Sequence, residues 1–398
     1  MARFTKIISE YLPIIILLFL VSDFLTNISI KNFDSVFRRY SGITKLLFEI
    51  IMIVTIIIKY KQFKRNYIVL LSLVLLFILS QFLYATGINY NLENELFHGN
   101  IYYFNRYLYI LLFIIFIKIM SIEQKVFLKT YTYFEYFLYV NSIAIFIGLI
   151  YNIELFRSYE YSSRFGYSGF FSKPGEASYM YIIAIVTNFY FWIIRKDKIN
   201  LYKIFFFIIV SLFLGQKKVL FFLLVLGLFY GLSYFKYKKW IKIVLLVSIP
   251  SLFVFKNEII KYIMQVSPFW QERYDEFGLL SVVTSYRNLL LEKVIEFISS
   301  DWRFWNYLFG GIDFIKFKTE FELVDLYLFL GFSGILFYIY IVYFHFMKNE
   351  NLLKRILIVI VFLTSFISGG LLLNVSAIVL FYIAIKKVML PIKKVHGN

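Results

Sequence analysis

Isolated basic residues beside apolar segments are the first candidates for chemistry in this chain. The turn Gly215-Gln216-Lys217-Lys218 places two adjacent lysines between two apolar stretches. Two neighbouring ammonium groups there favour a bound anion, although lysines at the end of an apolar helix also extend toward lipid headgroups. Arg287 begins a second such segment, where helix N-terminal N–H groups and a guanidinium together favour a phosphate-bearing ligand. An exposed arginine at the membrane interface is the alternative for that residue.

Acidic residues close to these segments could act on a substrate hydroxyl group. The candidates are Glu176, Glu322 and Asp325. Glu322 and Asp325 are three residues apart at the start of an expected helix, so their side chains would share one face. A carboxylate there could deprotonate or orient a hydroxyl. Alternatively, it could complement the positive end of the helix dipole.

The elements that must position these residues are apolar segments long enough to cross a membrane. Hydrophobic residues make up 61% of the 398 residues, and charged residues make up 17%. Stretches of about 16 to 24 apolar residues, at about 1.5 Å per residue, span a hydrocarbon core of about 30 Å. We therefore expect an all-α polytopic membrane protein in which residues 1–398 form one integral membrane domain. About a dozen transmembrane helices are predicted near 11–30, 43–59, 67–86, 104–120, 133–151, 178–195, 201–215, 219–235, 240–255, 323–346, 353–369 and 371–388.

The distribution of Lys and Arg predicts how the chain is oriented. Dense basic clusters occur in alternate connections, at 59–65, 118–129, 195–198, 236–239, 348–355 and 386–394. By the positive-inside rule these connections and both termini face the cytoplasm. The net charge of +18 then reflects topology and attraction to anionic membrane lipid, and no nucleic-acid partner is expected.

The remaining connections include a long segment, 257–322, which we expect to be a large extracytoplasmic loop between the ninth and tenth transmembrane helices. Within it, Arg287 to Ser300 has the pattern of an amphipathic helix. Such a helix would lie in the membrane interface or cover a cavity between the transmembrane helices. The chain has no Cys and only three His, at 98, 345 and 396, so we predict neither a metal site nor a cofactor.

Four stretches, in this order, resemble the bacterial O-antigen and capsular polysaccharide polymerases, which are relatives of the O-antigen ligases. They are Arg164-Phe165-Gly166 through Lys173-Pro174-Gly175-Glu176, then Gly215-Gln216-Lys217-Lys218, then Ser285-Tyr286-Arg287 with Leu308-Phe309-Gly310-Gly311, and finally Glu322-Leu323-Val324-Asp325 with Gly331-Phe332-Ser333-Gly334. The second stretch lacks the serine that is usual in the family, and Lys173 stands where Glu or Asn is common. Ligases tend to have a His where this chain has Glu322 and Asp325, and this difference favours a polymerase.

The resemblance implies a metal-independent glycosyltransferase with a GT-C-like fold in the bacterial cytoplasmic membrane. Donor and acceptor would both be oligosaccharide repeat units on undecaprenyl pyrophosphate, with membrane lipid, a chain-length regulator and a flippase as further partners. The residues implied in pyrophosphate binding are Arg164, Lys173, Lys217, Lys218 and Arg287. The catalytic residues would be Arg287, Glu322 and Asp325.

Two alternatives stay open at this stage. A ligase that transfers a finished chain from the lipid carrier shares most of these features. A flippase for lipid-linked oligosaccharides would also handle a pyrophosphate lipid, but it would place cations in a central cavity and show two related halves.

Overall fold

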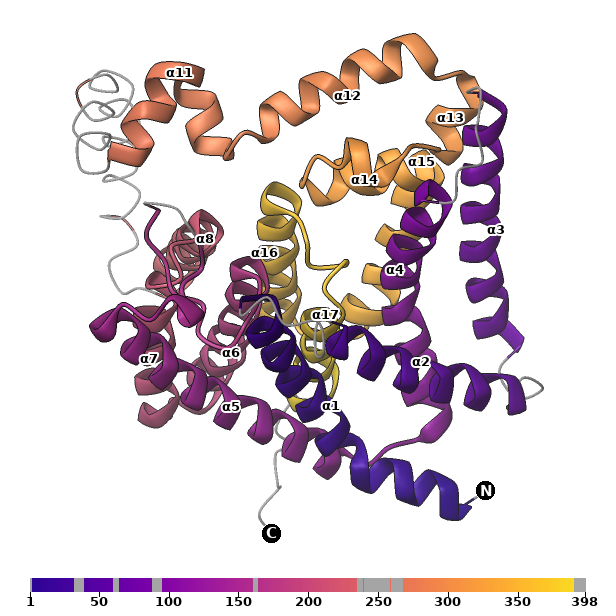
Figure 1. The fold of residues 1–398 in the computed structure, drawn as a ribbon. Helices are drawn as coiled ribbons and strands as arrows, with labels where there is room; N and C mark the ends of the chain where they lie inside the picture. The colour runs from indigo at the N-terminus through magenta and orange to yellow at the C-terminus, as the bar shows by residue number, and fades with distance from the viewer. Residues whose placement is uncertain are drawn as a thin grey trace.

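The protein is all-α, as the sequence predicts (Figure 1). A computed structural model describes residues 2–31, 39–59, 64–87, 95–159, 164–234 and 268–389, with single residues at 239 and 258. Within these ranges, an isolated bridge between Arg157 and Tyr167 is the one β-type contact.

Within the described ranges, seven helices are long and apolar enough to cross a membrane, so the chain is a multi-pass membrane protein. Each coincides with a predicted span. A long apolar segment in lipid must pair its own backbone N–H and C=O groups, and a helix does so. The seven are α1 (Ala2–Lys31), α2 (Tyr40–Ile58), α3 (Lys64–Gly87), α4 (Glu95–Met120), α5 (Gln124–Tyr151), α6 (Pro174–Arg195) and α15 (Glu322–Ile341), which η3 (Val342–Met347) continues.

Four further predicted helices are present but short. They are α7 (Lys198–Leu212), α8 (Lys217–Ser233), α16 (Leu352–Ser368), and α17 (Val375–Ile383) with η4 (Ala384–Val388). The 17 residues of α8 or α16 extend over about 25 Å, which is less than the hydrocarbon thickness of about 30 Å. The predicted helix at 240–255 lies outside the described residues. The described residues therefore contain seven candidate spans, and they do not show the predicted count of a dozen.

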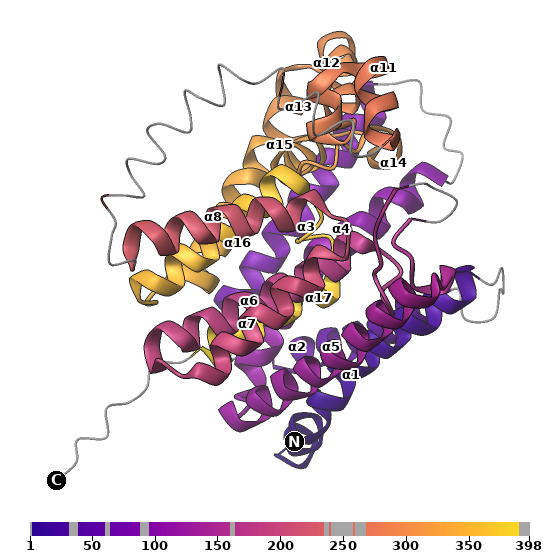
Figure 2. The ribbon, with the colours of Figure 1, turned by 90° about the vertical axis from the view of Figure 1, so that its left-hand side faces the viewer.

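Helix α6 forms the centre of the bundle. In the apolar 18-residue stretch of α6, 83% of the residues are buried, whereas only 28% are buried in the corresponding stretches of α2 and α3. Helix α6 packs against α7, α8, α16 and α17, and α1 packs between α2 and α5 (Figures 1 and 2). The apolar side chains left exposed on α2 and α3 are those expected of helices that face lipid.

Four helices lie across one end of the bundle, at the top of Figure 1. They are α11 (Pro268–Thr284), α12 (Arg287–Asp301), α13 (Phe304–Phe309) and α14 (Phe314–Phe317), and we call residues 268–317 the cap.

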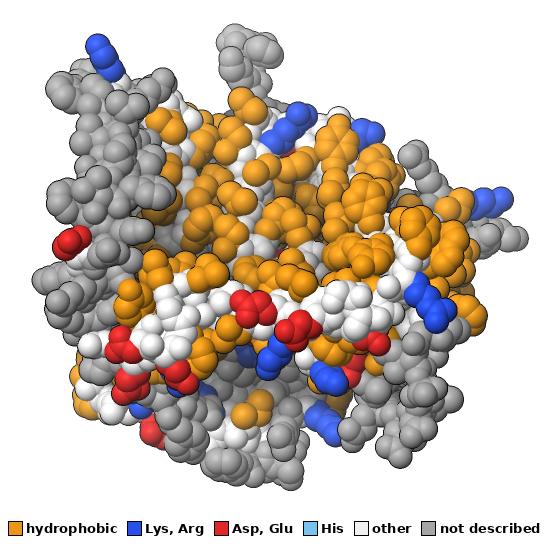
Figure 3. Space-filling view, turned by 90° about the horizontal axis from the view of Figure 1, so that it is seen from above, with side chains coloured by type: hydrophobic (Ala, Val, Ile, Leu, Met, Phe, Trp, Pro, Cys, Tyr) orange, Lys and Arg blue, Asp and Glu red, His pale blue; other side chains and the backbone are white. Residues whose placement is uncertain are grey.

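Helix α12 confirms the predicted amphipathic segment. Val294 is buried, and Phe297 stacks on Phe317 with ring centroids 4.4 Å apart. Glu292 and Lys293 on the opposite side are exposed. Viewed from above the cap, charged side chains form a band across the surface, with hydrophobic side chains gathered along one side of it (Figure 3).

The cap is attached to α15 through a close contact between two glycine turns. Gly331 interrupts α15 with φ 69°, and a Cβ at this residue would lie 2.3 Å from the carbonyl carbon of Leu308. The N–H of Gly311 donates to the carbonyl of Leu328 over 3.2 Å. Only glycine permits this conformation and this backbone approach, so the third and fourth stretches of the resemblance meet in space.

Candidate functional site

A cavity of about 940 Å³ lies between the bundle and the cap, and it contains the predicted anion-binding residues. Helices α1, α2, α4, α6 and α8 contribute to its wall, together with the start of α12 and the turn before α17. The predicted residues that line it are Arg164, Lys173, Lys217, Lys218 and Arg287. Three separate segments of the chain thus bring all five predicted cations to one space.

A close backbone contact holds the first two of these segments together. Gly215, in the turn between α7 and α8, has φ 67°, and a Cβ there would lie 2.0 Å from the carbonyl oxygen of Phe165. The N–H of Tyr167 donates to the carbonyl of Phe213 over 2.8 Å. A glycine is needed where the two chains approach this closely, and the contact places Arg164 beside the Lys217-Lys218 pair.

Arg164 and Lys217 share an aromatic environment. The Arg164 guanidinium lies 3.9 Å from the ring centroid of Tyr159 and 5.2 Å from that of Trp270 in the cap. The Lys217 ammonium lies 3.6 Å from the Trp270 centroid and donates to the carbonyl of Val282. Burial, with the charges of Arg164 and Arg287, lowers the pKa of Lys217 to about 8.

Lys218 is the most enclosed of the five cations. It is 8% exposed, and its Nζ lies 3.5 Å from the carbonyl oxygen of Gly369 and 4.4 Å from the ring centroid of Tyr179. No carboxylate of the described residues forms an ion pair with it. Burial and the nearby charge of Arg287 lower the pKa of Lys218 to about 7. A bound anion would offset this penalty.

Arg287 and Lys173 complete the predicted set. Arg287 begins α12, as predicted, and its guanidinium pairs with Glu320 over 3.3 Å. The turn before it places Ser285 and Tyr286 in the left-handed region, with φ 56° and 68°. Lys173 immediately precedes Pro174 at the start of α6 and is exposed.

The cavity as a whole has an excess of positive charge. Among the described residues, nine Lys and Arg side chains line it against four carboxylates, which are Asp23, Glu49, Glu176 and Glu320. Several of these charged side chains, among them Glu176 and Lys218, are buried, so their charges are screened less than they would be at a surface in water. Such an arrangement is suited to a polyanionic group such as a pyrophosphate.

The predicted catalytic carboxylate Glu322 is not part of the cavity lining. Its Oε2 accepts from Ser365 Oγ at 3.1 Å and from the N–H of Leu371 at 2.8 Å, and its Oε1 accepts from the N–H of Leu372 at 2.9 Å. The side chain is 1% exposed. These bonds attach the start of α15 to the turn between α16 and α17, which favours the structural alternative.

Asp325 has a similar environment. Its Oδ1 accepts from the N–H and the hydroxyl of Thr319, at 2.7 and 2.8 Å, and its Oδ2 accepts from the N–H of Glu320 at 3.1 Å. The side chain therefore holds the segment before α15 in place, and it too is absent from the cavity lining. A catalytic role for either carboxylate remains only a prediction.

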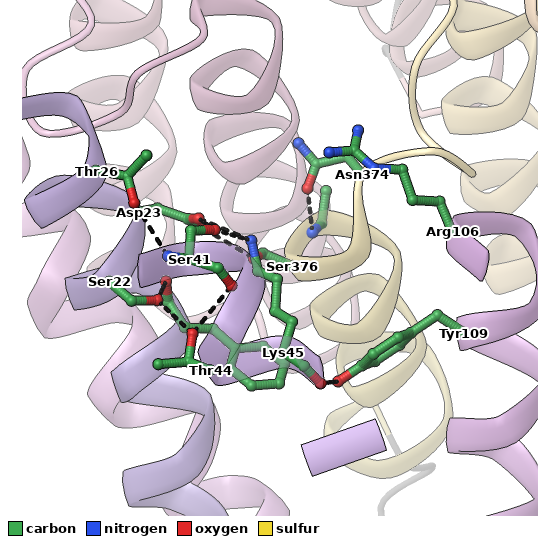
Figure 4. A network of polar contacts seen from close by, with 12 residues as sticks. Ser22, Asp23, Thr26, Ser41, Thr44, Lys45, Arg106, Tyr109, Asn374 and Ser376 are labelled. Atoms are coloured by element: carbon green, nitrogen blue, oxygen red, sulfur yellow. Dashed lines mark hydrogen bonds and ion pairs between the residues drawn. The ribbon is translucent and has the colours of Figure 1, made fainter. Parts of the chain in front are cut away.

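A polar network on the bundle side of the cavity was not predicted. Asp23 of α1 accepts from Lys45 Nζ at 2.7 Å, from Ser41 Oγ, and from Ser376 Oγ at 3.0 Å (Figure 4). Arg106 of α4 donates to the carbonyl of Leu373, which lies in the turn between α16 and α17. In the sequence the only indication is a group of polar residues, Ser22, Asp23 and Thr26, within an otherwise apolar helix.

The described residues contain no group of three His, Asp or Glu side chains arranged to hold a metal ion. The site thus offers fixed cations, hydroxyl groups and carboxylates for binding an anion and for moving a proton.

Fold and site together define a multi-pass helical membrane protein with a cationic cavity beneath a helical cap. Comparison with protein-family profiles, curated protein sequences and solved structures found no match.

Proposed function

We propose that this protein is a membrane glycosyltransferase that polymerises oligosaccharide repeat units carried on undecaprenyl pyrophosphate. The observation that supports this most strongly is that five cations from three segments line one cavity. Positive charge that is clustered in this way, and not spread over a surface, favours a specific anionic ligand.

The chemistry of such a transfer fits the groups in the cavity. A hydroxyl of the acceptor unit attacks the anomeric carbon of the donor, and the bond from that carbon to the pyrophosphate oxygen breaks. Negative charge develops on the departing pyrophosphate, and Arg164, Lys217, Lys218 and Arg287 would stabilise it. Fixed cations in a space of low dielectric are more effective than solvent because they need no reorganisation.

The size profile of polysaccharide in a strain that lacks the gene tests this proposal. A polymerase predicts that surface glycan shrinks to a single repeat unit. Long chains that accumulate on the lipid carrier would indicate a ligase, and single units trapped on the inner leaflet would indicate a flippase. Either of these two outcomes would contradict the proposal.

A further inference from the structure

The carboxyl group of Glu176 is the one acidic candidate from the sequence that faces the cavity. It lies in the first turn of α6 and is 8% exposed. Its Oε1 is buried and accepts no hydrogen bond from the described residues. A buried acceptor without a partner destabilises a protein, so such a group is a candidate for a contact with a ligand or for a catalytic role.

Charged groups of both signs lie near Glu176. Asp23 of α1 lies beside it, and Lys45 and Lys173 are the nearby cations. Asp23 already accepts hydrogen bonds from Ser41, Lys45 and Ser376, as Figure 4 shows. The carboxyl group of Glu176, which lines the cavity and has an oxygen without a partner among the described residues, is therefore an acceptor that this wall can offer to a ligand.

Glu176 is also next to the predicted pyrophosphate site. The preceding residue, Gly175, packs against Lys218, since a Cβ at Gly175 would lie 3.3 Å from Lys218 Nζ. In a transfer from a glycosyl pyrophosphate, the attacking hydroxyl must approach a carbon that is bonded directly to a phosphate oxygen. A base for that hydroxyl must therefore lie close to the cations that hold the phosphate.

We propose that Glu176 is the general base that accepts the proton of the acceptor hydroxyl, an inference that rests on the proposed function. As the O–H bond breaks, its electron pair forms the bond from the acceptor oxygen to the anomeric carbon. The bond from that carbon to the pyrophosphate oxygen breaks, and its electron pair leaves with the pyrophosphate. The proton passes from Glu176 to water before the next cycle. The ligand of this subsite is thus a hydroxyl-bearing saccharide, held beside the cations.

The test uses membranes from the strain that lacks the gene, because these contain the natural lipid-linked units. Purified wild-type protein, Glu176→Gln and Glu176→Asp are added, and the rate of polymer formation is measured across pH. Glu296→Gln, which changes an exposed carboxylate on α12, is the matched control. Binding of undecaprenyl pyrophosphate to each purified protein is measured separately.

We expect Glu176→Gln to polymerise about 100-fold or more slowly than the wild type, while it binds undecaprenyl pyrophosphate within about threefold of the wild-type affinity. Its residual rate should lose the decrease toward acidic pH that protonation of a base causes. Glu176→Asp, whose carboxylate is displaced by about one methylene, should keep this decrease but polymerise at least about tenfold more slowly than the wild type.

The two proposals fail in different ways. If wild-type protein forms no polymer, the proposed function is wrong. If the wild type polymerises and Glu176→Gln matches it, the function stands and the role of Glu176 is wrong. If Glu176→Gln does not fold, Glu176→Asp decides, and a wild-type rate in that variant would overturn the assignment.

Discussion

A buried lysine with no carboxylate partner stabilises the fold little, and this property makes Lys218 informative. The residue is 8% exposed, and among the described residues its ammonium group contacts a carbonyl oxygen and an aromatic ring but forms no ion pair with a carboxylate. Removing an uncompensated buried charge seldom destabilises a protein, whereas removing a ligand-binding charge weakens function.

We therefore predict opposite effects on stability and function for Lys218→Met. The melting temperature should equal or exceed that of the wild type. Binding of undecaprenyl pyrophosphate should fall about tenfold or more, since a charge-assisted bond contributes about 1.5–3 kcal/mol. Lys293→Met, at an exposed position on α12, is the control and should change neither quantity. A large loss of stability together with unchanged binding would show that Lys218 is structural.

Titration of Lys217 leads to a prediction about pH. Because its pKa is lowered to about 8, the free protein loses this positive charge as the pH rises through 8. Affinity for undecaprenyl pyrophosphate should therefore fall between pH 7 and pH 9. Lys217→Arg, which stays charged, should make the fall shallower. Binding that is constant over this range in the wild type would argue against a role for Lys217 in anion binding.

The elements that bring these residues together depend on turns that have little sequence signal. The apolar runs predicted α6, and the period of Leu290, Val294 and Phe297 predicted α12. The site did not follow from these elements alone. Asp23 and Ser376 are 353 residues apart and share a hydrogen bond, and no local pattern indicates such a pair. The sequence could not show that Glu322 accepts hydrogen bonds from Leu371 and Leu372, because these donors belong to a distant turn.

Substitution of Gly215 tests whether the turn between α7 and α8 holds Arg164 beside Lys217. We expect Gly215→Ala to push the loop that carries Arg164 away from Lys217, because its Cβ would meet the Phe165 carbonyl. Both melting temperature and undecaprenyl pyrophosphate binding should fall. Gly227→Ala is the matched control, because that helical glycine of α8 has open space around it and should tolerate a methyl group.

Substitution of Glu322 tests whether this side chain attaches the start of α15 to the turn between α16 and α17. Glu322→Gln replaces one carboxylate oxygen by an NH₂ group that cannot accept from a backbone N–H. We expect a loss of about 1–3 kcal/mol in stability and less protein in the membrane. Polymer per molecule of protein should stay near the wild-type value. Normal stability with a loss of polymer of about 100-fold would instead support the predicted catalytic role.

At the scale of the whole molecule, orientation decides which compartment the cap faces. The distribution of basic residues predicts that the cap is extracytoplasmic and that the connection near Lys196 is cytoplasmic. The chain has no Cys, so a single introduced cysteine is the one thiol that a reagent can label in this protein. A membrane-impermeant maleimide should label Glu296→Cys in intact cells and Lys196→Cys only after permeabilisation. The reverse pattern would place the cavity on the cytoplasmic side and contradict the proposed reaction.

Reconstitution provides the most direct test of the proposed activity. Purified protein in liposomes is supplied with lipid-linked units extracted from the strain that lacks the gene, and both polymer and released undecaprenyl pyrophosphate are measured. We predict polymer formation with one undecaprenyl pyrophosphate released per bond, and neither product with Arg287→Ala. Movement of units across the bilayer without bond formation would contradict the polymerase proposal, and unchanged polymer with folded Arg287→Ala would contradict the role of the cationic cavity.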